Sequence, residues 1–446
     1  ESMMKKLERS VQNRKIAEAV RFVYDAAMPK DLLEFVLKGN KIKRIDSIIP
    51  GGRYHNFKDF IHFPNIGLSN LMYRKLPLLP HPAGVDKVSL LSEIFKKDVL
   101  LYYPYHSFNF VIDVLREAAI DPDVVSIKIN IYRVATKSKI INALINAARN
   151  GKSVTAVIEL QARFDEERNI TWSNILQDEG VRVISGVPGL KVHSKLILIK
   201  KKSRGGHNYI SHIGTGNFHE GTAKVYTDAS LFTANKHICA EVQKIFAFVK
   251  NNYRRTTYRS LFVSPTNTRR NFLHLIDHEI TQAKKEKEAY IYVKLNNITD
   301  NELINKLYEA SNAGVKIKMI IRGICTLVPG VKGMSENIEV FSIVDRFLEH
   351  TRLFVFCHSG KEKIFLSSAD WMNRNLDRRL EVTAPILDAD IKKDVLEIFN
   401  AQFADNMKSR IIDRDGKNAY LKTNGKQVRS QISIYNYFRK KALSKK

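Results

Sequence analysis

The sequence has few cysteines and no long apolar run. Its 446 residues include three cysteines, Cys239, Cys325 and Cys357, whose spacing suits neither a zinc site nor a disulfide framework. No apolar stretch approaches the ~18 residues that a membrane span requires. These absences argue against a disulfide-stapled secreted domain and a transmembrane helix, and they favour a reducing cytoplasm.

The chain also lacks an apolar signal core and a methionine at position 1. Its first six residues, Glu1-Ser-Met-Met-Lys-Lys6, contain no hydrophobic segment of the kind that directs export. We therefore expect a fragment or processed form of a longer protein. A chain of 446 residues is too long for one core and predicts two or three domains.

Acidic residues are scarce relative to basic ones. The chain has 46 Asp and Glu against 73 Lys and Arg, a formal net charge of +27. Such an excess repels itself and indicates a polyanionic partner. Charge alone does not choose between nucleic acid, an anionic membrane surface and polyphosphate.

Turn residues and composition divide the chain. Residues 1–80 predict helices and irregular connections, with turn chemistry at Pro50-Gly-Gly52 and a proline-rich break at residues 77–82. From Val85 onward the pattern becomes α/β. The basic segment at residues 422–446 predicts a solvated helix, with polyanion contact as a secondary interpretation.

One α/β unit occurs twice. Each copy runs from a strand to a capped helix, a second strand and an arginine. In order, these are residues 124–132, Ser138, residues 154–158 and Arg163 in the first copy, and residues 289–295, Asp300, residues 315–321 and Arg322 in the second. The repeat predicts a duplicated α/β domain with its boundary near residues 260–270.

Each copy also carries a histidine on an apolar strand. His193 stands two residues before Lys195, and His350 two residues before Arg352. Side chains two apart in a strand share a face. A neighbouring cation neutralises phosphoryl oxygens and disfavours the imidazolium, which keeps the ring nucleophilic near neutral pH. A lone histidine would better be interpreted as a core residue, but two in matching repeats indicate a site that handles phosphate.

A short turn of small residues follows each histidine strand, Gly214-Thr-Gly-Asn217 and Ser367-Ser-Ala-Asp370. Glycine permits close backbone approach, and hydroxyl and amide groups bind phosphate oxygens. The arrangement resembles the phospholipase D superfamily, whose two repeats each give a histidine to one central site. Two departures are Lys200, where an acidic residue is expected, and Arg352 in place of lysine.

The departures and several further motifs resemble the polyphosphate kinase family. The matching stretches are residues 98–108, 127–133, 159–166, 191–195, 214–217, 226–228, 322–325, 346–350 and 367–370. They occur in order from about residue 85 to residue 400. A weaker resemblance at residues 52–56 looks like the end of the family's helical head domain.

This resemblance implies an α/β fold of two tandem phospholipase D-like domains that share one active site, preceded by a helical head-domain remnant. We expect the remnant and a linker at residues 1–80, the first catalytic domain at 81–262, and the second, with the basic tail, at 263–446. The implied activity is reversible transfer of the ATP γ-phosphoryl group to inorganic polyphosphate through a phosphohistidine. A cytoplasmic protein that is a homo-oligomer at full length is also expected.

The resemblance further implies roles for individual residues. His193 would be the phosphorylated nucleophile, and His350 a second catalytic histidine that contacts nucleotide phosphate. The expected contacts to ATP or phosphate are Tyr226, Arg322, His350, Lys195, Asn217 and Arg352. Arg133 and Arg163 match a magnesium site. Because a guanidinium cannot ligate a dication, we expect them to hold the phosphates that bind Mg²⁺.

Alternatives remain for several residues. Arg163 could pair with the acidic residues at 165–167, Arg352 with Glu349 or Glu381, and Tyr226 could pack in the core. For the whole protein, the rivals are a phospholipase D-type phosphodiesterase or nuclease and a non-catalytic polyanion-binding protein. Nucleic acid is not expected as the physiological substrate.

Overall fold

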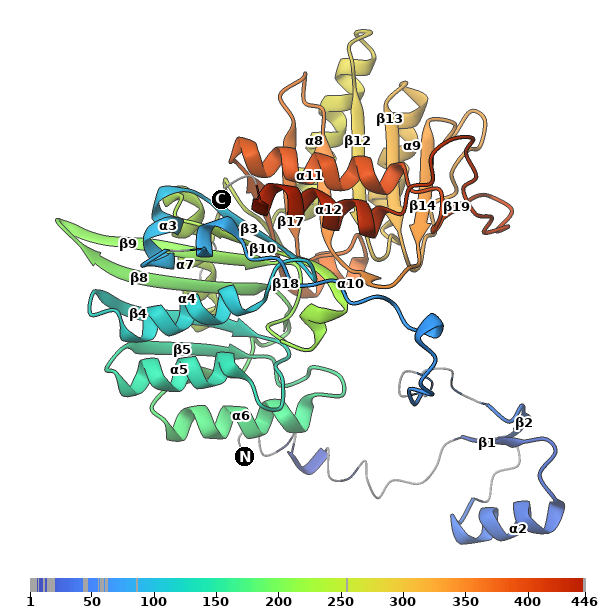
Figure 1. The fold of residues 1–446 in the computed structure, drawn as a ribbon, viewed down its shortest axis with the longest axis horizontal. Helices are drawn as coiled ribbons and strands as arrows, with labels where there is room; N and C mark the ends of the chain where they lie inside the picture. The colour runs from blue at the N-terminus through green and yellow to red at the C-terminus, as the bar shows by residue number, and fades with distance from the viewer. Residues whose placement is uncertain are drawn as a thin grey trace. The chain divides into compact units, whose positions relative to one another are not determined.

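The computed structural model describes residues 6, 8–10, 13, 21–42, 47–54, 56, 60, 63–85, 87–253 and 256–443. Residues 1–75 and 76–446 form two compact units. In the first unit, the parallel strands β1 (Phe22–Asp25) and β2 (Ile48–Gly51) accompany helix α2 (Lys30–Gly39) (Figure 1). The strand pair corrects the expectation of helices and irregular connections alone, because strands of four residues are too short to show a period-two pattern. The first five residues of the chain lie outside the described residues.

The second unit contains two sheets, which confirm the tandem α/β architecture (Figure 1). The strands that the first half contributes to its own sheet are β3 (Val99–Tyr103), β4 (Val124–Ile131), β5 (Ser153–Ile158), β6 (Arg182–Ile184), β8 (Lys195–Ser203), β9 (Gly206–Gly214) and β10 (Tyr226–Thr233). Those of the second half are β11 (Phe262–Ser264), β12 (Tyr290–Leu295), β13 (Lys316–Ile321), β14 (Ile338–Ile343), β16 (Arg352–Phe356), β17 (Lys363–Ser367), β18 (Arg379–Ile386) and β19 (Ser409–Ile412).

Each sheet also takes one short strand from the other half. From the first half, β7 (Lys191–Val192) pairs in parallel with β18. From the second half, β15 (Leu348–Glu349) pairs in parallel with β10. A histidine follows each of these strands directly, so the exchange brings both histidines to the boundary between the sheets.

Amphipathic helices cover the sheets. The helices of the first half are α3 (Leu90–Lys96), α4 (Asn109–Ile120), α5 (Lys139–Arg149), α6 (Glu166–Asp178) and α7 (Lys236–Lys250). Those of the second half are α8 (Thr268–Ala283), α9 (Asn301–Asn312), α10 (Asn373–Asp377), α11 (Ala389–Phe403) and α12 (Ser430–Leu443). The predicted caps are confirmed: Ser138 Oγ accepts the Ile141 N–H at 3.4 Å, and Asp300 Oδ1 accepts the Leu303 N–H at 3.1 Å.

The C-terminal helix differs from the expectation of a solvated helix. α12 buries Ile434, Tyr435 and Phe438 in an apolar cluster that α7 and α11 also enter. Residues 434 and 438 are four apart and lie on one helical face, a stripe that the surrounding lysines obscure in the sequence. Within the described ranges, we find no helix whose length and hydropathy suit a bilayer-spanning segment.

Candidate active site

His193 lies in a break between β7 and β8, where the sequence predicted one continuous strand. Its Nδ1 is 2.8 Å from Oε1 of Glu381, which β18 of the other half supplies. Tyr132 stands edge-on to the ring, with 4.8 Å between centroids. Burial lowers the pKa of His193 to about 3, although Glu381 opposes the shift. The ring is therefore neutral near pH 7.

The hydrogen bond of His193 fixes its tautomer. A carboxylate can only accept, so Nδ1 carries the proton and Nε2 the lone pair. Among the described residues, no hydrogen-bond partner of this Nε2 is found. The geometry thus leaves the nucleophilic nitrogen of His193 available.

His350 has a similar carboxylate partner but a different second neighbour. Its Nδ1 lies 2.9 Å from both carboxylate oxygens of Asp228, which β10 of the first half supplies. Arg352 Nη1 lies 3.1 Å from Nε2 and 3.3 Å from Nδ1 of the same ring, and it donates to Nε2, because Nδ1 carries the proton that faces Asp228. Burial and then Arg352 lower the pKa of His350, while Asp228 opposes them. His350 is thus a neutral ring whose Nε2 lone pair is already engaged.

Hydroxyl groups from the two small-residue turns hold the carboxylates. Thr215 Oγ1 donates to Asp228 at 2.6 Å, and Ser368 Oγ donates to Glu381 at 2.5 Å. Burial alone would raise the pKa of each acid. For Asp228, His350 and then Thr215 outweigh burial and lower the pKa. For Glu381, His193 and then Lys195 and Arg379 do so. A Cβ at Gly216 would collide with the Asp228 carboxylate, so this turn requires glycine.

Arg352 takes part in a buried ion pair. Its Nε lies 3.2 Å from Oδ1 of Asp370, and its Nη1 donates to the backbone carbonyl of Thr215 at 3.4 Å. Burial would raise the pKa of Asp370, but the Arg352 charge holds it well below its usual range. Asp370 is thus the partner, rather than Glu349 or Glu381, which the sequence suggested.

Lys195, the equivalent cation of the first half, has no such partner. Its side chain donates to the backbone carbonyl of His193, and it forms no ion pair with the described residues. It is 1% exposed. Burial lowers the pKa of Lys195 to about 7, with Glu381 opposing the shift and Arg352 adding to it. Asn217, which replaces the acid of the second turn, has a buried Oδ1 without a hydrogen-bond partner.

Tyr226 and Arg322 lie on the His350 side of the site. The Tyr226 ring is 5.3 Å from the His350 ring. Arg322 Nε donates to Asn296 Oδ1 at 2.7 Å, and Asn296 Nδ2 donates to the His350 backbone carbonyl at 3.1 Å. Burial and then the nearby Arg352 lower the pKa of Arg322. These predicted residues therefore form one cluster.

The strand registers correct the alignment of Arg163 with Arg322. The pairs β4–β5 and β12–β13 both remain in register up to their last residues. The next residue is Glu159 after β5 and Arg322 after β13. Glu159 is buried and accepts the Val192 N–H at 2.7 Å, directly before His193. An acid and an arginine thus occupy equivalent places in the two halves.

Arg133 and Arg163 lie at the edge of the first half's site. Arg133 Nε is 2.7 Å from Asp165 Oδ2, its Nη2 donates to the Arg163 backbone carbonyl at 2.8 Å, and its guanidinium is 5.6 Å from the Tyr132 ring. Arg163 is exposed and lies over the Phe164 ring at 4.8 Å. Asp165 therefore pairs with Arg133 rather than with Arg163. In the part of the chain that the structure describes, no group of His, Cys, Asp and Glu side chains could hold a metal ion.

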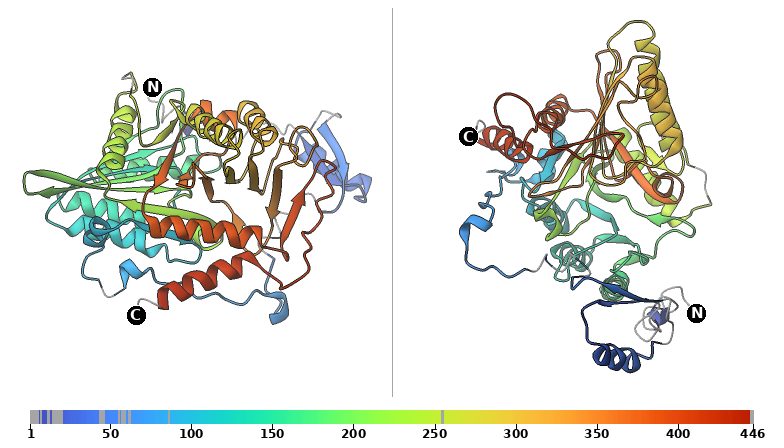
Figure 2. Two further views of the ribbon diagram at one scale, coloured as in Figure 1. Left: turned by 90° about the horizontal axis from the view of Figure 1, so that it is seen from above. Right: turned by 90° about the vertical axis from the view of Figure 1, so that its right-hand side faces the viewer.

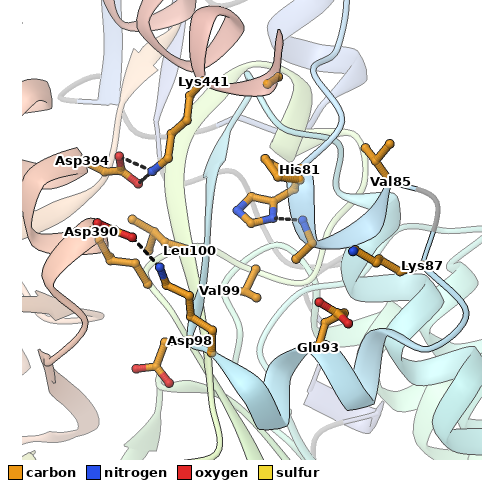
Figure 3. Close-up of a pocket in the computed structure, with 15 residues that line it drawn as sticks. His81, Val85, Lys87, Glu93, Asp98, Val99, Leu100, Asp390, Asp394 and Lys441 are labelled. Carbon is orange, nitrogen blue, oxygen red and sulfur yellow. Dashed lines mark hydrogen bonds and ion pairs between the residues drawn. The ribbon is translucent and has the colours of Figure 1, made fainter. Parts of the chain in front are cut away.

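A cavity of about 690 Å³ lies apart from these residues, between α3 and β3 of the first half and α11 and α12 of the second. None of the predicted site residues lines it. Figure 3 shows its lysines against carboxylates, with Lys97 paired to Asp390 and Lys441 to Asp394, each at 2.5 Å. Because these charges offset each other, the histidine cluster is the better candidate for phosphoryl chemistry.

Asp228 and Glu381 orient the two histidines, a role that the sequence did not predict for either residue. One signal could have identified them. Asp228 stands 13 residues after Thr215, and Glu381 stands 13 residues after Ser368. Extending the repeat beyond the turns would therefore have shown an acid at the same offset in each copy.

Known families match the chain along most of its length. Residues 1–63 match the polyphosphate kinase middle domain, residues 89–255 the polyphosphate kinase C-terminal domain 1, and residues 261–431 the polyphosphate kinase C-terminal domain 2. Similar curated proteins include the polyphosphate kinases of Vibrio vulnificus strain CMCP6, 51% identical over 439 residues, and Escherichia coli strain K12, 49% identical over 442 residues. These alignments cover 98% of this chain and 63% and 64% of the respective relatives.

A solved structure is similar too. The crystal structure of polyphosphate kinase from Porphyromonas gingivalis matches with a TM-score of 0.87 and 37% identity, over 96% of this chain and 66% of that one. The chain thus spans just under two thirds of the length of these relatives. The matched domains contain both histidines and both carboxylates that hold them. The chain belongs to the polyphosphate kinase family.

Proposed function

We propose that this chain contains the catalytic centre of a polyphosphate kinase, which transfers the γ-phosphoryl group of ATP to inorganic polyphosphate through phosphorylated His193. The observation that carries this proposal is the difference between the two histidines. Nε2 of His193 is available, whereas Nε2 of His350 accepts a hydrogen bond from Arg352. The name shared by the curated relatives supports the choice of substrates.

The first step is an in-line attack by Nε2 of His193 on the γ-phosphorus. The P–N bond forms as the bond from the γ-phosphorus to the β,γ-bridging oxygen breaks, and ADP leaves. Glu381 accepts the Nδ1 proton in a hydrogen bond and stabilises the positive charge that develops on the ring. In the second step, a terminal oxygen of polyphosphate attacks the phosphorus and breaks the P–N bond. The reverse sequence makes ATP.

The remaining residues stabilise and position phosphate. Lys195, Arg322 and Arg352 concentrate positive charge where the transferring oxygens gain negative charge. His350 contacts the nucleotide phosphates and exchanges a proton with them. Tyr226 offers a ring and a hydroxyl beside His350 for the nucleotide, and Asn217 offers its amide to phosphate oxygens.

We propose that Mg²⁺ arrives with the nucleotide as part of the substrate. Arg133 and Arg163 carry only hydrogen-bond donors, so they suit the phosphates that surround the ion and not the ion itself.

Labelling with γ-labelled ATP tests the function. We expect an acid-labile, base-stable label on His193 that chases into polyphosphate when unlabelled polymer is added. Cleavage of a phosphodiester without a labelled histidine would instead support the phosphodiesterase rival. A protein that binds polyanions but shows neither activity would support the non-catalytic rival.

A cytoplasmic setting is also proposed. Cys239, Cys325 and Cys357 are free thiols. Burial raises the pKa of both Cys239 and Cys325 to about 11, so these two remain protonated near neutral pH. Unpaired thiols suit a reducing compartment. Trapping thiols with an alkylating agent in intact cells should find all three unoxidised.

A further inference from the structure

One face of the first sheet carries cations and hydroxyl groups in register. Lys128 on β4 lies opposite Thr155 on β5, and Thr155 lies opposite Arg182 on β6. Residues directly opposite each other project to the same face. In the next row, Lys200 on β8 lies opposite Ser126 on β4. Ser126 and Lys128 are two residues apart, so both rows share one face.

Lys201, the neighbour of Lys200, projects to the other face and is charge-compensated. Its Nζ lies 2.5 Å from Oδ2 of Asp121. No acidic side chain among the described residues forms an ion pair with the cations of the first face. We call this surface the basic sheet face, defined by Lys128, Arg182, Lys200, Ser126 and Thr155 of the strands and by Lys250 at the end of α7, whose charge acts on Lys128.

The cations of the basic sheet face lie close enough to repel one another. Lys128 is half-buried, and burial is the main cause that lowers its pKa. The charges of Lys200, Lys250 and Arg182 lower that pKa further. Arg182 and Lys250 are exposed to solvent. Like charges concentrated without a counter-ion favour an anionic ligand.

The helices of the first half cover this face only in part, and Arg182 and Lys250 remain exposed. α4, α5 and α6 contact β4, β5 and β6, while α7 contacts β8 and β9. Figures 1 and 2 show α4 and α5 on one face of the sheet and α7 on the opposite one. α4, α5 and α6 therefore cover the face opposite to the cations, whereas α7 packs on the cation face over β8 and β9 and brings Lys250, its last residue, near Lys128.

The second half shows that the fold does not need these cations. The row equivalent to Lys128, Thr155 and Arg182 is Tyr292, Lys318 and Glu339. Lys318 Nζ lies 3.7 Å from Glu339 Oε1, and the Tyr292 ring packs against Phe403 of α11 at 5.1 Å. One sheet thus covers and neutralises the row that the other leaves open and positive.

We propose that the basic sheet face binds inorganic polyphosphate as an accessory docking surface, separate from the two histidines. Neighbouring strands lie ~4.8 Å apart, which places the cations and hydroxyls at short, regular intervals along a linear polyanion. Tyr209, the aromatic residue in these rows, packs against the core. The paired residues of these rows therefore offer no fully exposed aromatic ring for base stacking. The choice of polymer rests on the proposed function.

The test compares two triple variants in a His193→Ala background, where binding is measured without turnover. The first carries Lys128→Gln, Arg182→Gln and Lys200→Gln. The matched control carries Lys284→Gln, Lys285→Gln and Lys287→Gln, which removes the same charge from exposed positions after α8. We expect the first to bind fluorescent long-chain polyphosphate about tenfold more weakly, with a shallower salt dependence, and the control to bind about as the parent does.

Each outcome decides the proposal. Equal losses in both variants would show a general charge effect, and unchanged binding in the first would show no site; either result overturns the docking surface. Single-stranded nucleic acid could also compete for the surface more strongly than unlabelled polyphosphate does. If the first variant alone loses this competition, the assigned partner is wrong. Thermal melts confirm folding. If unmutated protein forms no phosphohistidine but the binding difference remains, the catalytic proposal fails and the docking surface stands.

Discussion

The two halves of the active site share a frame and differ in charge. In each, a carboxylate from the other half holds Nδ1 of the histidine, and a hydroxyl holds the carboxylate. The residues around this frame differ between the halves. The equivalent pairs, first half before second, are Lys195 and Arg352, Asn217 and Asp370, Tyr132 and Asn296, and Glu159 and Arg322. The frame thus sets the tautomer of both rings, whereas the surrounding charge decides which Nε2 is available to react.

Replacing the histidines by alanine, one at a time, should give the largest loss of activity. His193→Ala should abolish the phosphoenzyme and polymer synthesis, because Nε2 of the second histidine, His350, is engaged by Arg352. His350→Ala should slow phosphoenzyme formation and leave the label on His193, since the nucleophile remains. A labelling time course with peptide mapping measures both. Label on His350 in His193→Ala would reverse the assignment of the halves.

Thermal melts separate a catalytic role of His350 from a structural one. If His350 is only a core residue, His350→Ala should lower the melting temperature and leave the rate of the folded fraction near normal. If proton transfer is the missing function, added imidazole should partly restore the rate.

Replacing the two carboxylates should give smaller losses of rate, and the loss should again be larger for the residue that holds His193. Glu381→Gln should slow phosphoenzyme formation by about 10²–10⁴-fold, because an amide can donate to Nδ1 and impose the wrong tautomer on the nucleophile. Asp228→Asn should slow phosphoenzyme formation less, since Asp228 holds His350, which is not the nucleophile. Single-turnover rates compare the two. A larger loss of rate in Asp228→Asn would mean that the orientation of His350 matters more for phosphoenzyme formation than that of His193.

Arginine variants test the cationic side of the comparison. Arg322→Ala should slow turnover by about 10²–10³-fold, the usual loss for one donor to developing charge. Arg133→Ala and Arg163→Ala should each lower turnover by more than about tenfold if they hold substrate phosphates. Steady-state kinetics with matched melts measure the three. Full activity in Arg163→Ala would show that the side chain, which lies over the Phe164 ring, does not hold substrate phosphate.

Asn217→Asp should give the smallest effect, a shift in pH dependence. Lys195 has a pKa of about 7, so its charge, and the phosphate contact it provides, is lost as pH rises through that value. The mutant places an acid where Asp370 accompanies Arg352, which should raise the pKa of Lys195 and move the fall in rate to higher pH. Single-turnover rates across pH measure the shift, and Lys195→Met should lack this step. An unchanged profile in Asn217→Asp would contradict the pairing.

Local patterns in the sequence predicted much of the fold. Apolar periodicity and the caps Ser138 and Asp300 located the repeated units, because caps and stripes depend on residues within a turn or two of helix. The same alternation placed His193 beside Lys195 and His350 beside Arg352. These predictions needed no knowledge of how distant segments meet.

The parts that were missed depend on pairing between distant segments. Glu381 reaches His193 across 188 residues, and Glu159 is the counterpart of Arg322 only because of strand register. The Arg133–Asp165 pair likewise arises from how one loop folds back on another. Local rules name the residue types that are present, but tertiary contacts choose their partners.

The exchanged strands make the two halves depend on each other. Since β7 completes one sheet and β15 the other, each half on its own would lack the carboxylate that orients its histidine. The connection between α7 and β11 acts as a tether, which holds each half near its partner at an effective concentration on the order of millimolar or higher. A substitution at Asp228 would directly affect His350, which belongs to the other half of the chain. The cation beside each ring, Lys195 or Arg352, thus comes from its own half, but the carboxylate that orients the ring comes from the other.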